Sequence, residues 1–293
     1  MATYHCSVRV GGKGKAAAHA AYISRSGKYA DLRAGEKLEY VESGNMPKWA
    51  EHSPAQFWHS ADQHERANGS TYREFELALP RELNPDQRRE LVRDFVAQEI
   101  GDRHAYTLAI HNPRAALTKG EQPHAHIMFT QRRRDEIERD PEQYFKRFNS
   151  KTPERGGCQK LSGGKTRAER RAELIALRER WAEKTNSHLK QYGHDASVDH
   201  RSLKDRGLDR APEPHFGPKK IRRMTAEDVG SILKRRTAEG ELERAQCEAQ
   251  SSIDLSGNLS DARRERVRRQ AAQEAAAGVK DARTRFDLGF NRW

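Results

Sequence analysis

Two apolar runs that carry histidines constrain the fold of this chain more than any other feature. Residues 104–111, HAYTLAIH, and residues 124–132, HAHIMFTQR, have the length and the β-branched and aromatic content of strands, and a polar loop separates them. Side chains two residues apart in a strand point to the same face, so His124 and His126 face one side and the apolar residue between them faces the other. Two such strands joined by a loop favour a hairpin in an antiparallel sheet.

The segments around this hairpin predict an α+β architecture. The patterns predict strands at residues 3–10 and 70–80 and helices over residues 16–27, 54–69, 84–101 and 167–192. The helix at 84–101 has the clearest start, because Asn84 can cap it and a proline occupies its first position. We therefore expect a central antiparallel sheet flanked by helices, with a helical C-terminal tail.

Charge is distributed unevenly along the chain. There are 55 Lys and Arg against 43 Asp and Glu, and the formal charge of +12 favours an anionic partner such as nucleic acid. Residues 225–293 hold 13 basic and 12 acidic side chains, so a charge of +11 lies in residues 1–224. This division predicts a working domain at residues 1–222 and a charged helical extension at residues 223–293.

Cysteine usage and the N-terminal sequence favour an intracellular protein. Cys6, Cys158 and Cys247 lie far apart, which fits neither a disulfide framework nor a paired zinc motif. The first ten residues, MATYHCSVRV, lack the basic and apolar regions of a signal peptide. No segment approaches the ~18 apolar residues of a membrane span. We expect a soluble protein in a reducing compartment.

A third histidine, His111, ends the first strand of the predicted hairpin. If the two strands pair, His111 lies opposite His124 and His126, and the three imidazoles form a partial coordination shell with positions open for water or substrate oxygens. Imidazoles bind Mn, Zn or Ni as readily as Mg, so ligand chemistry alone does not choose the ion. The alternative is that His111 caps its strand and the other two histidines line a polar face.

Tyr22, in the run AAYISRSGKYA, is the candidate nucleophile. A tyrosine is long enough to reach a phosphate on a sheet face, but its attack requires a nearby base or the field of a cation. Tyr29, seven residues further on, is the competing choice. Tyr22 could equally be a core residue beside Ile23.

The predicted strand at 70–80 brings two carboxylates to one face. Glu74 and Glu76 alternate with Phe75 and Leu77, which face the other way. A carboxylate there could orient a ligand histidine or accept the tyrosine proton. Both could also be solvent-facing strand residues, and the sequence does not decide between these roles.

Residues 141–166 form a loop-rich stretch in which basic and aromatic side chains alternate. Such a mixture suits phosphates and stacked bases of a nucleic acid. The alternative is a hydrophilic surface excursion. The basic members are Lys146, Arg147, Lys151, Arg155 and Lys160, and the aromatic members are Tyr144, Phe145 and Phe148.

Several longer motifs, taken in order, resemble the MobA/MobL family of plasmid mobilisation relaxases, MobQ-type members of the HUH endonuclease superfamily. The resemblance runs from Tyr4 to about Pro218 and leaves the tail uncovered. The motifs are YHCSVRV, AAYISRSGKYA, ESGNMP, ERANG, EFELALP, YTLAIHN, PHAHIMFTQR, YFKRFNSKTPERGG, GHDASVDHRSL and HFGP. The histidines of the last two motifs, His200 and His215, have no assigned role.

The resemblance implies an activity and a set of site residues. It implies strand-specific nicking of single-stranded DNA at an origin of transfer, through a 5′-phosphotyrosyl intermediate that is later religated, on a palm-like antiparallel sheet. The implied catalytic residues are Tyr22, Glu74 and Glu76, and the implied metal ligands are His111, His124 and His126, with Mg or Mn as the usual ion. The candidate DNA contacts are Arg25, Lys28, Tyr144, Lys146, Arg147, Lys151 and Arg155.

The resemblance also implies partners and a location. Accessory mobilisation proteins and the coupling protein of a type IV secretion system are expected partners besides the DNA, and the bacterial cytoplasm is the expected location, with export alongside the transferred strand. Three alternatives remain: a rolling-circle replication initiator of the same superfamily, a DNA-binding protein without catalysis, and a zinc-dependent hydrolase that uses water. Substitution of Tyr22 separates the relaxase from the last two, since only a tyrosine transesterase loses a covalent DNA adduct. The replication initiator shares this chemistry, and the order of the motifs favours mobilisation over replication.

Overall fold

The computed structural model describes residues 4–30, 37–115, 120–161, 165–207, 218–221 and 223–242, together with five isolated positions further along. The chain divides into two compact units, Met1–His215 and Phe216–Trp293. In the second unit, helix α6 is Pro218–Ile221 and residues 226–242 are helical, the latter within the tail that was expected to be helical. No helix within these ranges is both long and apolar enough to cross a membrane.

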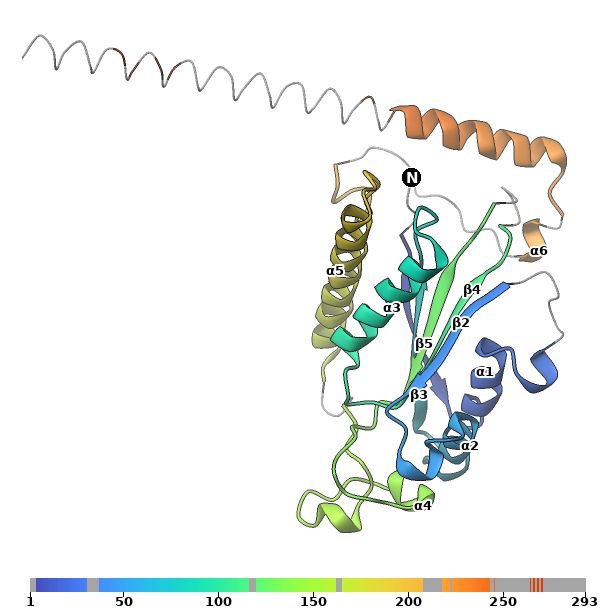
Figure 1. Ribbon diagram of the computed structural model, residues 1–293, viewed down its shortest axis with the longest axis vertical. Helices are drawn as coiled ribbons and strands as arrows, with labels where there is room; N and C mark the ends of the chain where they lie inside the picture. Colours follow the sequence, from blue (N-terminus) through green and yellow to red (C-terminus); the bar gives the residue numbers. More distant parts are fainter. Residues whose placement is uncertain are drawn as a thin grey trace, which may run out of the picture. The chain divides into compact units, whose positions relative to one another are not determined.

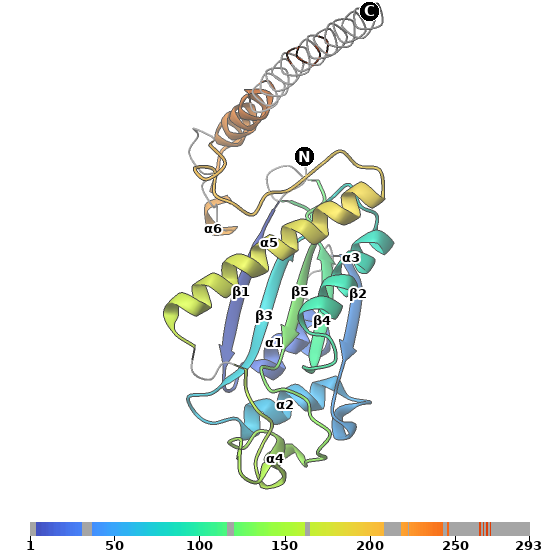
Figure 2. The same cartoon turned by 90° about the vertical axis from the view of Figure 1, so that its left-hand side faces the viewer.

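The first unit is built on a five-stranded sheet in which all neighbouring strands are antiparallel, with the order β1-β3-β5-β4-β2 (Figures 1 and 2). The α+β prediction is therefore confirmed. The strands are β1 (Cys6–Gly12), β2 (Lys37–Gly44), β3 (Ser70–Ala78), β4 (Tyr106–Asn112) and β5 (His124–Phe129). The predicted hairpin of β4 and β5 lies inside the sheet, with β3 and β2 beyond it on either side.

Strand β2 is the one strand of the sheet that the sequence patterns did not predict. It pairs with β4 and forms one edge of the sheet, and its register is irregular between Leu38 and Tyr40. None of its residues is fully buried. An edge strand of this kind lacks the apolar run by which a buried strand is recognised, so sheet pairing rather than local composition defines it.

The helices begin where the sequence predicts and mostly end earlier. Helix α3 has the expected capping box, in which Asn84 and Gln87 satisfy each other's backbone N–H groups. Helix α2 was expected to continue to Gly69 but ends at His64, because the next residue, Glu65, is extended. The helices of the first unit are α1 (Ala16–Ile23), α2 (Pro54–His64), α3 (Pro85–Glu99), α4 (Pro141–Tyr144) and α5 (Arg167–Gln191).

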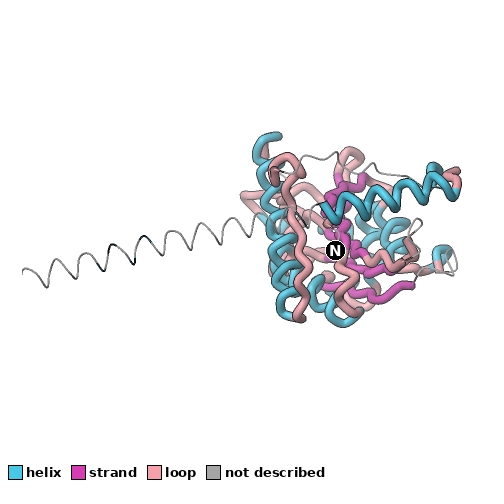
Figure 3. The backbone as a smooth tube through the Cα atoms, turned by 90° about the horizontal axis from the view of Figure 1, so that it is seen from above, coloured by secondary structure: helices cyan, strands magenta, loops and turns pink. Residues whose placement is uncertain are grey.

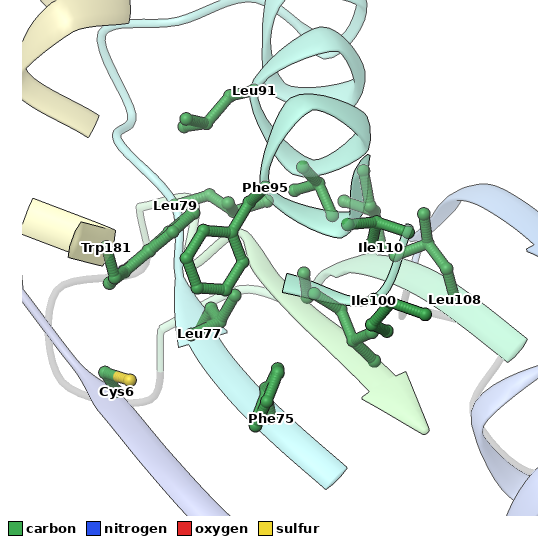
Figure 4. Close-up of a cluster of buried hydrophobic side chains, with 14 of the residues drawn as sticks. Cys6, Phe75, Leu77, Leu79, Leu91, Phe95, Ile100, Leu108, Ile110 and Trp181 are labelled. Atoms are coloured by element: carbon green, nitrogen blue, oxygen red, sulfur yellow. The ribbon is translucent and has the colours of Figure 1, made fainter. Parts of the chain in front are cut away.

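One face of the sheet packs against α3 and α5 through a large apolar core. Phe95 of α3 lies between the sheet and α5, with its ring 4.9 Å from that of Trp181 (Figure 4). Phe75 and Leu77 of β3 project into this core, as their alternation predicts. The close packing of these side chains restrains the sheet on the face that contacts α3 and α5. The histidines of β4 and β5 lie on the opposite face.

The opposite face packs against α1, α2 and α4, so helices flank the sheet on both sides (Figure 3). Phe57, Trp58 and Ala61 of α2 are buried there. Tyr144 and Phe145 belong to the same core, with Tyr144 only 5% exposed. The three histidines of β4 and β5 share this face with Ala109 and Met128, so α1 and α2 define their surroundings.

Candidate functional site

The β4–β5 hairpin brings the three histidines together. His111 is directly opposite His124 in the register, and His126 follows two residues later on the same face. One ring nitrogen from each lies within 4.8 Å of the others. Metal–imidazole bonds are about 2.1 Å long, so nitrogens that bind one ion lie at most about 4.2 Å apart, and the rings would have to move closer together on binding. The three imidazoles form a set that could hold a metal.

Hydrogen bonds fix which nitrogen of each ring is available. Nδ1 of His124 lies 3.0 Å from the carbonyl oxygen of Gln122, and Nε2 of His111 lies 2.6 Å from that of Ile23. Nδ1 of His126 lies 2.7 Å from a carboxylate oxygen of Glu74. These oxygens only accept hydrogen bonds, so the three nitrogens donate and the lone pair of each ring lies on its other nitrogen, which in His111 is 3.4 Å from a guanidinium nitrogen of Arg25.

Burial keeps His111 in the neutral form that metal binding requires. The side chain is almost completely enclosed, with 1% exposure. This burial, with smaller effects of His126 and Arg25, lowers the pKa of His111 to about 4 although its bond to the Ile23 carbonyl acts in the opposite direction. His111 is therefore uncharged at neutral pH.

The structure distinguishes the two carboxylates of β3. Glu74 is 1% exposed, and one of its oxygens accepts hydrogen bonds from both His126 and His19, at 2.7 and 2.8 Å. Burial alone would raise the pKa of Glu74, but these two hydrogen bonds lower it to about 2. Glu76 instead pairs with Arg9 on β1, at 2.7 Å. Only Glu74 contacts a histidine of the triad among the contacts that the structure gives these two carboxylates.

Tyr22 lies on α1, which packs directly beside the histidines. The next residue, Ile23, supplies the carbonyl that His111 contacts. Arg25 connects the two features: its guanidinium donates to the Tyr22 carbonyl at 2.7 Å, lies 4.6 Å from the centre of the Tyr22 ring, and approaches Nδ1 of His111 at 3.4 Å. A cation therefore lies between the candidate nucleophile and a candidate metal ligand.

The backbone of Arg25 adopts the left-handed conformation, with φ of +50°. A side chain other than glycine rarely takes this conformation, and it costs on the order of 1–3 kcal/mol. The conformation ends α1 at Ile23, four residues before the predicted stop at Gly27. Strain of this kind is often found at functional sites, where the surrounding contacts hold it in place.

Tyr29 is also close to the candidate nucleophile. It lies on the 3-10 helix η1 (Gly27–Tyr29), with its ring edge-on to that of Tyr22 at 5.7 Å and the ammonium of Lys28 5.1 Å from its centre. The chain contacts between α1 and His111 nevertheless involve the neighbours of Tyr22, not those of Tyr29. The residues that contact His111 are therefore neighbours of Tyr22 in the chain.

Two polar residues that support the site were absent from the sequence predictions. His19 lies three residues before Tyr22 on α1 and contacts Glu74, and Asp62 of α2 accepts hydrogen bonds from the backbone at Gly14, Ala16 and Ala17. The spacing of His19 and Tyr22 places both on one side of a helix and could have identified His19. No local sequence pattern predicts that Asp62 contacts the first turn of α1.

The basic loop, residues 141–160, differs from its expected form in one respect. Lys146, Arg147, Lys151 and Arg155 are exposed, as a DNA contact requires. Tyr144 is enclosed between α2 and Phe145, and burial raises its pKa far above the usual range. Its ring is not available to stack on a base, so Tyr144 is a core residue here and not a DNA contact.

Buried arginines hold the basic loop in shape. Arg132, 2% exposed, donates to the carbonyls of Phe145, Lys146 and Cys158 and pairs at 3.0 Å with Glu65, the residue that follows α2. Lys160, expected to be part of the basic surface, is half-buried and also pairs with Glu65, at 2.9 Å.

His200 is half-buried outside the triad, and His215 lies outside the described residues.

Comparison with known proteins gives consistent results. The model of the MobA/MobL family matches residues 15–226. The 43 kDa relaxation protein of Salmonella typhimurium is 59% identical over 210 residues, which cover 72% of this chain and 56% of that protein. Mobilization protein A of Escherichia coli is 38% identical over 292 residues, covering 97% of this chain and 39% of that protein. The chain thus spans about half the length of these relatives, or less.

A solved structure described as "Molecular Basis of Vancomycin Resistance Transfer in Staphylococcus aureus" also aligns with this chain. The TM-score is 0.48 and the identity 23%, over 69% of this chain and 100% of that one.

Proposed function

Because this chain belongs to the MobA/MobL family, we propose that it is the relaxase of a mobilisable plasmid. It cuts one strand of single-stranded DNA at the origin of transfer and remains joined to the new 5′ end through Tyr22. The observation that carries the proposal is the position of Arg25, whose guanidinium contacts both the Tyr22 residue and the candidate metal ligand His111. On this proposal, a phosphate bound between Tyr22 and His111 also contacts the Arg25 guanidinium.

The histidine triad supplies the metal site in this proposal. His111 would bind through Nδ1, and His124 and His126 through Nε2, since their other nitrogens donate to fixed acceptors. We infer that the ion is Mg²⁺ or Mn²⁺, which also accept hard phosphate oxygens. When bound, it would neutralise charge that develops on the non-bridging oxygens of the scissile phosphate.

Tyr22 and Arg25 carry out the remaining steps. The Tyr22 hydroxyl oxygen attacks phosphorus in line and loses its proton as the new phosphorus–oxygen bond forms. The bond to the 3′ oxygen breaks, and that oxygen takes up a proton and becomes a free 3′ hydroxyl. Arg25 stabilises the negative charge on the phosphate during this exchange. No phosphodiester bond is lost in total, so the 3′ hydroxyl can reverse the reaction and reseal a strand.

The substrate must be unpaired at the cleavage site, because Tyr22 on the helix side of a sheet cannot reach a phosphate within a duplex. Lys28 and the exposed cations Lys146, Arg147, Lys151 and Arg155 are the proposed contacts to the DNA backbone. Such contacts release counterions, so affinity should fall steeply with salt.

Residues 223–293 carry nearly balanced charge and are proposed to form the partner-binding part of the chain. Accessory mobilisation proteins and the coupling protein of a type IV secretion system are the proposed partners. On this proposal the protein works in the bacterial cytoplasm and accompanies the transferred strand. Residues 1–222 then contain the nicking activity.

Oligonucleotides labelled at either end test the reaction. Single-stranded DNA that spans the transfer origin of the plasmid carrying this gene is incubated with Mg²⁺ or Mn²⁺ and either the wild type or Tyr22→Phe. The wild type should give a protein-linked product with the 3′-labelled strand only, because Tyr22 joins the new 5′ end. The Tyr22→Phe variant should bind the same DNA with unchanged affinity and form no adduct.

Other outcomes identify the alternatives. Cleavage by Tyr22→Phe without an adduct means that water attacks, as in a zinc-dependent hydrolase. An adduct that persists in Tyr22→Phe and disappears in Tyr29→Phe identifies Tyr29 as the nucleophile. DNA binding by the wild type that needs no metal and produces no cleavage leaves a binding protein and refutes the proposal.

A further inference from the structure

His19 occupies the middle of α1, on the side that faces the sheet. Its Nε2 lies 2.8 Å from Oε1 of Glu74, and its ring stacks on that of Tyr72 at 5.0 Å with an angle of only 7° between the planes. The ring of Tyr22, one turn further along α1, is centred 6.3 Å from that of His19. His19 thus contacts β3 on one side and approaches the nucleophile candidate on its own helix.

The acceptor of this hydrogen bond is shared with the metal centre. The same oxygen of Glu74 accepts from Nδ1 of His126 at 2.7 Å. Glu74 is 1% exposed, so water cannot replace a donor that is lost. One buried oxygen therefore joins a candidate metal ligand to the helix that carries Tyr22.

Two other contacts fix the ends of α1. Asp62 accepts hydrogen bonds from the backbone N–H groups of Gly14, Ala16 and Ala17 at 2.8 to 3.0 Å, which holds the first turn. His111 contacts the carbonyl of Ile23, which holds the last. These backbone contacts set the ends of the helix, whereas the side chain of His19 restrains its rotation about its own axis. Because residues three apart share a side of a helix, this rotation sets the direction of Tyr22.

We propose that His19 is a positioning residue, which fixes the nucleophile helix to the metal centre through Glu74. The inference rests on the proposed function of Tyr22. His19 itself contacts neither the phosphate nor the ion. Its effect is to keep the Tyr22 hydroxyl aligned with a phosphate held at the triad, and a displacement of about 1 Å at such a position can reduce a rate about 100-fold.

Two substitutions in the full-length protein separate the hydrogen bond from the packing. His19→Leu keeps apolar volume against Tyr72 but has no donor, and His19→Gln keeps an N–H donor that can reach Glu74. His59→Leu, an exposed histidine on α2, is the matched control. Each variant is measured for amide hydrogen exchange over residues 16–24 without metal or DNA. Single-turnover adduct formation with Mn²⁺ and affinity for the single-stranded transfer-origin oligonucleotide are measured in parallel.

His19→Leu should form the adduct at least tenfold more slowly with DNA affinity within about twofold of the wild type. Exchange over residues 16–24 should accelerate severalfold in the same variant. His19→Gln should recover most of both losses, and His59→Leu should resemble the wild type. A purely structural role would lower DNA affinity and thermal stability together with the rate, and glutamine would not restore the rate.

The proposal is overturned if His19→Leu exchanges and reacts like the wild type, or if His19→Gln is as impaired as His19→Leu. If His19→Leu fails to fold, His19→Asn takes its place, because the shorter amide cannot reach Glu74. If the wild type itself forms no Tyr22-dependent adduct, the proposed function fails. Hydrogen exchange alone then decides whether His19 anchors α1.

Discussion

At the scale of single residues, the site depends on buried groups whose protonation is set by burial in His111 and by hydrogen bonds in Glu74. His111 is enclosed and neutral, and Glu74 is enclosed and ionised because two histidines donate to it. An enclosed imidazole donates through one nitrogen and presents a lone pair at the other, which is the form a metal requires. The same enclosure makes the protein sensitive to acid.

Acid should weaken the metal-free protein through His111. Its pKa of about 4 when folded lies below the value of about 6.5 expected for an unfolded chain, so protons bind the unfolded state more readily. The contribution of neutral His111 to the free energy of unfolding is constant above about pH 6.5 and is lost as the pH falls toward 4. The free energy of unfolding of the wild type should fall, relative to that of His111→Gln, by on the order of 2 kcal/mol between pH 7 and 4.5.

Urea unfolding with EDTA at a series of pH values measures this difference. His59→Gln, at an exposed position, provides the control and should follow the wild type at every pH. A difference between wild type and His111→Gln that does not change with pH would contradict the assignment of a low pKa to His111.

At the scale of elements, a network of buried charges holds the basic loop against α2. Arg132 donates to three loop carbonyls and pairs with Glu65, and both side chains are at most 2% exposed. Carbonyls that are not part of helix or strand need such partners when they are buried. The exposed cations of the loop are therefore presented from a fixed backbone.

Arg132→Met should release the loop, because three carbonyls lose their donor and Glu65 keeps only Lys160 as a cationic partner. A buried carbonyl left without a donor costs about 1–3 kcal/mol, which urea unfolding would detect. Subtilisin should cleave within residues 146–156 faster than in the wild type. Arg133→Met, an exposed neighbour, should change stability by less than about 0.5 kcal/mol. Equal stability of the two variants would show that the Arg132 network does not hold the loop.

At the scale of the whole molecule, all residues of the candidate site belong to the first compact unit. Both apolar cores and the histidine triad lie before residue 215. The excess positive charge also lies before residue 225. Among the described residues, the members of both cores and of the triad all come from the first unit.

A chain that ends after Arg222 should therefore keep the proposed activity. We expect unchanged Mn²⁺ affinity by calorimetry, the same rate of Tyr22-dependent adduct formation, and the same dependence of DNA affinity on salt, because the phosphate-binding cations remain. The full-length protein is the control. A smaller salt dependence in the shortened chain would mean that the tail contacts DNA, and loss of folding would refute the division at residue 222.

Much of the site followed from short-range sequence patterns. Alternation along residues 104–111 and 124–132 predicted a hairpin with three histidines on one face, and pairing of β4 with β5 confirms that arrangement. The same patterns did not identify β2, because an edge strand without buried residues has no apolar signature. They also assigned Tyr144 to a surface, since the sequence does not reveal that α2 encloses it.

The sequence by itself determined the residue types, their faces on strands and helices, and the family. It did so because periods of two and 3.6 residues are local properties of the backbone. Only the tertiary structure decided between Glu74 and Glu76, which face the same way on β3 and differ only in their neighbours. Glu76 forms an ion pair with Arg9 on β1, whereas Glu74 accepts hydrogen bonds from His19 on α1 and His126 on β5. Contacts between distant segments make that choice, and no local pattern contains them.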